Sequence, residues 1–161
     1  MSTQEREPTP NVSLNAPGVT VESADGSGLM FDQIARRYDL VNRVISLGLD
    51  QSWRAQLIDA LPSEGELLDV ATGTADVALS IAKRAPKSTL VGLDPSVGML
   101  DVGREKVARR GLQERVTLDV GDALAMPYAD DRFEGCCVAF GIRNFPDRLQ
   151  GLREMARVTK S

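Results

Sequence analysis

The sequence of 161 residues contains no histidine and only two cysteines. Histidine is the commonest general base, so its absence removes every Ser-His and Cys-His mechanism. Cys136 and Cys137 are adjacent, and neighbouring residues on a strand point to opposite faces, which argues against a bridge between them. Two cysteines without histidine also argue against a zinc site, and we expect no metal. We interpret both cysteines as small buried apolar side chains.

Basic stripes, long apolar runs and a secretory leader are missing as well. The formal net charge is −4 and no block of Lys and Arg occurs, which argues against a nucleic-acid partner. No apolar segment approaches the ~20 residues needed to span a bilayer. The start of the chain, "MSTQEREPTP", lacks the positive and apolar regions of a signal peptide. These absences favour a cytoplasmic protein.

The composition changes near residue 29. Residues 1–28 are rich in Ser, Pro, Asn, Gly and Thr and have few large apolar side chains, so we expect a disordered tail. From residue 29 onward apolar residues recur at helical spacing, which predicts helices over 29–61. Gly48 ends the first of these helices, and Asp50 is placed to cap the second.

Strands and helices alternate over residues 66–161. We predict strands over 66–71, 88–94, 115–120 and 133–141, and helices over 76–84, 97–110 and 146–158. Such alternation predicts a parallel sheet with right-handed crossovers. The expected fold class is therefore α/β, a doubly wound Rossmann-like sheet, within one domain of residues 29–161.

The turn "ATGTAD", residues 71–76, follows the first predicted strand. Ligands of doubly wound sheets lie at the carboxyl ends of the strands. Asp94 ends the second strand, about 20 residues after Gly73, which is the spacing at which an acidic residue accepts hydrogen bonds from a ribose. An adenosine-type ligand is one interpretation; the alternative is a turn that binds nothing, beside a surface aspartate.

The small number of glycines in this turn discriminates between adenosine ligands. A dinucleotide fingerprint needs G-x-G-x-x-G, whereas only Gly73 occurs in that span. Asp76 opens the following helix, where a carboxylate competes with a pyrophosphate for the same N–H groups. S-adenosylmethionine carries no phosphate, and its cationic end suits Asp69 and Asp76. The residues therefore favour this cofactor over NAD and FAD.

Four segments then occur in a familiar order, namely "LLDVATGTAD", "VGLDPSVGML", "GDALAMPYADDRFE" and "AFGIRNFPDRLQGLREMARVTK". Together they resemble the class I methyltransferase fold, and more narrowly the ubiquinone/menaquinone biosynthesis C-methyltransferase family (UbiE/MenG type). The upstream segment "FDQIARRYDLVNRVISLGLDQSWR" resembles the N-terminal signature of that family. The resemblance covers about residues 29–160.

The resemblance implies a set of cofactor contacts. Thr74 would touch the methionine part of S-adenosylmethionine, and Gly73 would let the backbone come close. Asp94 would accept hydrogen bonds from the ribose hydroxyls. Asp122 and Ala123 would line the adenine, with Asp122 accepting from its exocyclic amine.

Three further residues have competing interpretations. Asp69 would reach the amino end of the cofactor through water, or it is a buried strand acid satisfied by backbone donors. Met99 and Met126 would pad the adenine, or they are ordinary core residues.

The resemblance also implies a substrate and residues near it. Tyr38 and Asp39, with Asn42 and Trp53, would belong to helices that cover the pocket, while Arg143 and Asn144 would lie beside the target ring. Helix anchoring and loop capping are the alternative roles for these residues. The implied reaction is methyl transfer to a ring carbon of a demethylated prenylquinol, with a carboxylate, a tyrosine or water as the base.

The sequence departs from the family pattern at several positions. Asp50, Ala75 and Ala139 stand where relatives commonly have His, Gly and Ser. Relatives also continue from "ARVTK" into Pro-Gly-Gly and further strands, so we expect an incomplete sheet of order 3-2-1-4. Its last strand would then be an open edge that invites self-association. An S-adenosylmethionine-binding or interaction protein without catalysis, and a nicotinamide oxidoreductase, are the alternative functions.

Overall fold

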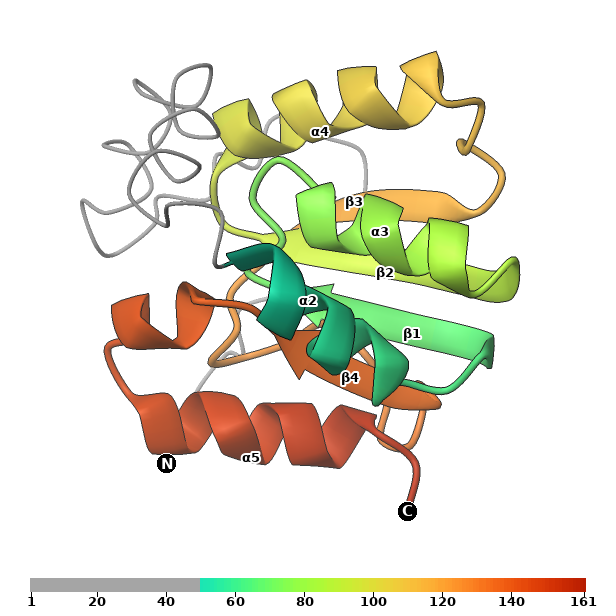
Figure 1. The fold of residues 1–161 in the computed structure, drawn as a ribbon. Helices are drawn as coiled ribbons and strands as arrows, with labels where there is room; N and C mark the ends of the chain where they lie inside the picture. The colour runs from blue at the N-terminus through green and yellow to red at the C-terminus, as the bar shows by residue number, and fades with distance from the viewer. Residues whose placement is uncertain (1–49) are drawn as a thin grey trace, which may run out of the picture.

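The computed structural model describes the backbone of residues 50–161 and the side chains from Arg54 onward. These residues form a parallel sheet of order β3-β2-β1-β4 with helices on both faces, as Figure 1 shows. The elements in chain order are α2 (Asp50–Asp59), β1 (Glu64–Val70), α3 (Asp76–Arg84), β2 (Lys87–Asp94), α4 (Val97–Arg109), β3 (Val116–Val120), β4 (Gly135–Val138), η1 (Gly141–Asn144) and α5 (Arg148–Val158). The predicted fold class and strand order are confirmed for this part of the chain.

Two hydrophobic cores lie on the two faces of the sheet. One core joins α3 and α4 to the sheet and includes Cys137, whereas the other lies under α5 and has Cys136 packed against it. Both cysteines are free thiols, and they face opposite sides as predicted. Burial raises the pKa of Cys136 to about 12, so this thiol is unreactive near neutral pH.

Local sequence accounts for most element boundaries. The run Leu67–Val70 is fully buried because β1 is a central strand covered on both faces. The side chain of Ser96 caps α4 by accepting from the N–H of Met99 at 3.2 Å, and Asp147 caps α5 by accepting from the N–H of Gln150 at 3.0 Å. The predicted helices over 76–84, 97–110 and 146–158 are confirmed to within two residues.

The fourth strand is shorter than its apolar run predicted. It covers only Gly135–Val138, and the chain then turns through Phe140, whose φ is +62°, into the 3₁₀ helix η1. The reason is a close approach that periodicity does not encode. A Cβ on Gly141 would lie 2.3 Å from the Cβ of Ala71, so only glycine lets this segment pass the turn after β1.

The outer edge of the sheet is partly paired. Phe133, just before β4, forms a parallel bridge with Thr159, in which its N–H donates to Val158 O and its carbonyl accepts from the N–H of Lys160, both at 2.9 Å. β4 itself is the last strand of the sheet within the described range. No helix of this range is both long and apolar enough to cross a membrane. The expected tail 1–28 and the expected helix before Asp50 lie outside the described residues.

Candidate functional site

The turn between β1 and α3 has an unusual backbone. Ala71, Gly73 and Ala75 all have positive φ, at +55°, +56° and +65°. Left-handed alanines cost about 1–2 kcal/mol each, and such strain is concentrated at functional sites. The Thr72 N–H donates to Leu93 O and the Ala75 N–H donates to Thr72 O, each at 3.0 Å, and these bonds hold the turn.

Asp94 ties this turn to the end of β2. Its Oδ2 accepts from the Gly73 N–H at 2.8 Å and its Oδ1 accepts from the Ser96 N–H at 2.9 Å, while the residue is 8% exposed. The predicted neighbourhood of Gly73 and Asp94 at one edge of the sheet is therefore confirmed.

Asp69 lies beneath the turn and is 1% exposed. Its Oδ2 accepts from the Thr72 hydroxyl at 2.7 Å, and the Cys137 thiol lies 3.6 Å from Oδ1. Burial raises the pKa of Asp69 to about 6, although the hydrogen bonds from Thr72 and Cys137 oppose this rise. The geometry favours the interpretation of Asp69 as a buried acid, with the side chains of Thr72 and Cys137 as donors.

Lys106 of α4 reaches the mouth of α3, and sequence reasoning did not identify it. Its Nζ donates to the Thr74 hydroxyl and pairs with Asp76 Oδ1, both at 2.8 Å. The charge of Asp76 is therefore compensated, and Asp76 contributes less negative potential than the sequence alone indicated. Thr74 is 4% exposed, with its hydroxyl directed at Lys106. No local pattern reveals a pairing across 30 residues.

The segment after β3 joins the same edge. The Gly121 N–H donates to Asp94 O at 3.2 Å, which sets the two loops side by side. Asp122 is exposed, and its Oδ1 accepts from the Leu124 N–H at 2.8 Å, while Ala123 is 8% exposed. The structure thus brings Gly73, Asp94 and Asp122 to one edge, as predicted.

The remaining candidates divide into three groups. Arg143 and Asn144 are exposed on η1, which begins against Ala71. Tyr38, Asp39 and Asn42 lie outside the described residues, and Trp53 belongs to α2 without a described side chain. Met99 and Met126 are each 4% exposed, in agreement with the interpretation of both as core residues.

The hydrogen-bonding groups at this edge discriminate between adenosine ligands. A pyrophosphate binds the free N–H groups of a turn and helix start. Here the N–H groups of Thr72, Gly73 and Ala75 already donate to protein oxygens. The edge offers carboxylates at Asp94 and Asp122 instead, which suit hydroxyls and an amine. The residues therefore fit a phosphate-free adenosine ligand such as S-adenosylmethionine.

Comparison with known proteins gives a matching family. The model of the ubiE/COQ5 methyltransferase family matches residues 20–161. The chain is 48% identical over 134 residues to "Ubiquinone/menaquinone biosynthesis C-methyltransferase UbiE" of Geotalea daltonii, covering 81% of this chain and 57% of that protein. It is 46% identical over 134 residues to "Demethylmenaquinone methyltransferase" of Bacteroides fragilis, covering 82% of this chain and 55% of that protein. The chain thus spans little more than half the length of these relatives.

A solved structure supports the fold. A SAM-dependent methyltransferase from Aquifex aeolicus superimposes with a TM-score of 0.59 at 23% identity, covering 66% of this chain and 58% of that one. At this identity the likeness shows the shared fold alone.

Proposed function

Because this chain belongs to the ubiE/COQ5 methyltransferase family, we propose that it serves S-adenosylmethionine-dependent C-methylation of a demethylated prenylquinol in menaquinone or ubiquinone biosynthesis. The names of its relatives support this substrate class. The observation that carries the proposal is the pair of backbone bonds to Asp94. They fix a carboxylate at the sheet edge and use the Gly73 N–H that a dinucleotide would need.

Each cofactor residue is proposed to have the role that the family resemblance implies. Asp94 accepts from the ribose hydroxyls, Asp122 accepts from the adenine amine, and Ala123 lies under the ring. Gly73 and Thr74 border the methionine end, and Asp69 supports the turn from below. Asp94 and Asp122 also make the edge negative, which favours a cationic ligand.

Arg143 and Asn144 are proposed to orient the quinol. They follow β4, and η1 begins against the turn that would border the methyl group. Bound S-adenosylmethionine would supply an electrophilic methyl group. The ring carbon would bond to this methyl group as the carbon–sulfur bond breaks, and the ring would then lose its proton to a carboxylate, a tyrosine or water. The positive guanidinium of Arg143 would favour the electron-rich phenolate form of the ring. Tyr38 and Asp39 are proposed to cover the pocket.

The prenyl tail suggests where the reaction occurs. We propose a cytoplasmic protein. Because a prenylated quinol resides in a membrane, we also propose peripheral contact with the membrane through this substrate. Self-association through the outer edge of β4 is a further proposal, because this strand has a neighbour only on the β1 side over Gly135–Val138 in the sheet described above.

Calorimetry and a transfer assay test this function together. S-adenosylhomocysteine should bind and NAD should not, and the chain should transfer a labelled methyl group to a demethylmenaquinol. Tighter binding of NAD would contradict the cofactor assignment. Binding without transfer would instead support the alternative, an S-adenosylmethionine-binding protein without catalysis.

A further inference from the structure

We propose that Gln150, Glu154 and Arg157 of α5 are positioning residues, which hold the loop between β3 and β4 so that Asp122 and Ala123 receive the adenine. The inference rests on the adenine assignment made above. None of the three side chains was a candidate from sequence, and each acts on the ligand only through the loop.

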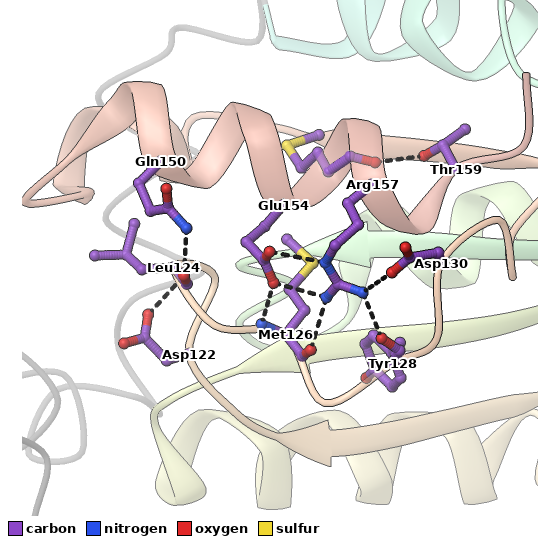
Figure 2. A network of polar contacts seen from close by, with 10 residues as sticks. Asp122, Leu124, Met126, Tyr128, Asp130, Gln150, Glu154, Arg157 and Thr159 are labelled. Carbon is purple, nitrogen blue, oxygen red and sulfur yellow. Dashed lines mark hydrogen bonds and ion pairs between the residues drawn. The ribbon is translucent and has the colours of Figure 1, made fainter.

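The loop depends on side chains for its backbone hydrogen bonds. Residues 121–134 contain no helix and only one bridging residue, so their carbonyls lack regular partners. The carbonyls of three alternate residues are bound by α5, as Figure 2 shows. Gln150 Nε2 donates to Leu124 O at 3.2 Å, and Arg157 donates from Nη2 to Met126 O at 3.0 Å and from Nη1 to Tyr128 O at 2.8 Å. One helix thus supplies the partners that a neighbouring strand would give.

Glu154 completes the arrangement at Met126. Its Oε2 accepts from the Met126 N–H at 2.8 Å, and its two oxygens bind Arg157 at 2.7 and 2.8 Å. Met126 is therefore held at both its N–H and its carbonyl. The hydrogen bond from Arg157 lowers the pKa of Glu154, so the carboxylate stays ionised at neutral pH.

The spacing of these residues puts them on one face of α5. Positions 150, 154 and 157 lie four and three residues apart, which aligns their side chains along a helix. Arg153, on the same helix, is exposed and binds none of these three carbonyls. The polar face of α5 is therefore directed at the loop, and Arg153 offers a matched control for Arg157.

Hydrogen bonds through Leu124 connect α5 to Asp122, which with Ala123 is proposed to bind the adenine. Leu124 is bound by Gln150 through its carbonyl and by Asp122 Oδ1 through its N–H. The Asp122 carbonyl in turn accepts from the Ala125 N–H at 3.2 Å. Ala123 and Met126 are buried in the core beneath α5. A change in α5 therefore alters the orientation of the Asp122 carboxylate without touching the ligand.

Arg157→Lys is the decisive variant, because lysine keeps the charge but lacks the planar fork that binds two carbonyls and Glu154 together. Calorimetry would compare S-adenosylhomocysteine with S-inosylhomocysteine, which lacks the exocyclic amine. We expect Arg157→Lys to bind S-adenosylhomocysteine about tenfold more weakly, equivalent to ~1.4 kcal/mol, and to discriminate less between the two ligands. Arg153→Lys should change neither value.

Gln150→Ala provides a milder test, since it removes only the Leu124 bond and leaves the Glu154–Arg157 pair. Like Arg157→Lys, it should reduce the ratio of the affinities for S-adenosylhomocysteine and S-inosylhomocysteine, with an unchanged melting temperature. If the wild-type chain binds and discriminates but both variants keep its ratio of affinities, the positioning role is refuted while the proposed function stands. If the wild-type chain binds neither ligand, the proposed function fails, and this inference fails with it.

Discussion

The backbone N–H of Gly73 lies 2.8 Å from Oδ2 of Asp94, although the two residues are 21 positions apart in the sequence. This bond joins the turn after β1 to the end of β2. It makes one carboxylate both a structural acceptor and the proposed acceptor for a ribose. Loss of Asp94 therefore affects the turn and the ligand together.

Asp94→Ala should weaken binding of S-adenosylhomocysteine by about 1–3 kcal/mol, because hydroxyls and the Gly73 N–H lose their acceptor. Calorimetry measures the change. Asp101→Asn is the control, since Asp101 is an exposed helix residue paired with Arg104. Unchanged affinity in Asp94→Ala would show that the carboxylate serves the turn alone.

Asp69 should make stability depend on pH. Burial raises its pKa from 3.8 to about 6, so between these pH values the folded chain binds more protons than the unfolded chain. The free energy of unfolding should therefore fall as the pH rises through this window, by on the order of 3 kcal/mol from this group. Asp69→Asn should remove that dependence, because an amide does not titrate there. Urea unfolding from pH 4 to pH 7 compares the two proteins, and parallel curves would contradict the shift.

The close approach of Gly141 to Ala71 should appear as an energetic coupling between substitutions at the two positions. Gly141→Ala should destabilise the fold by about 1–3 kcal/mol, because its new Cβ would overlap that of Ala71. Ala71→Gly removes the opposing Cβ and relieves a φ of +55°, so the double variant should recover most of the loss. Chemical denaturation of all four proteins gives the coupling energy, and additive effects would exclude the contact.

Lys106→Met should change the affinity for S-adenosylmethionine relative to the affinity for its product, S-adenosylhomocysteine. The substitution leaves the Asp76 carboxylate uncompensated and makes the edge more negative. S-adenosylmethionine carries a sulfonium charge that S-adenosylhomocysteine lacks, so the ratio of their affinities should rise roughly twofold in favour of the former. Lys83→Met, at the other end of α3, should leave the ratio unchanged. A ratio that does not respond to Lys106→Met, or that responds equally to both, would refute this local effect.

Sequence reasoning succeeded where geometry follows from the repeating fold. The neighbourhood of Gly73, Asp94 and Asp122 could be predicted, because parallel strands end at one edge and the alternation identified the strands. The starts of α4 and α5 were predicted to within two residues, because a helix start depends on residues only a few positions away.

The rest depends on contacts between distant segments. The end of β4 was misplaced because the proximity of Gly141 to Ala71 is set by tertiary packing. Lys106 could not be assigned to Asp76, nor Arg157 to the carbonyls of Met126 and Tyr128, because a basic residue on a helix has many potential partners. These contacts control the charge and shape of the edge, so composition and spacing describe it only in outline.

The strand pairings predict the order in which the two sides of the edge form during folding. β1 pairs with β2 across one short helical crossover, but its pairing with β4 brings together Asp69 and Cys137, which are 68 residues apart. Distant pairings close larger loops and form later during folding. The Asp94 side of the edge should therefore acquire hydrogen-exchange protection first. The side carrying Arg143 and Asn144 should follow, so a chain still folding would form the half proposed to bind the nucleoside before the half proposed to bind the ring.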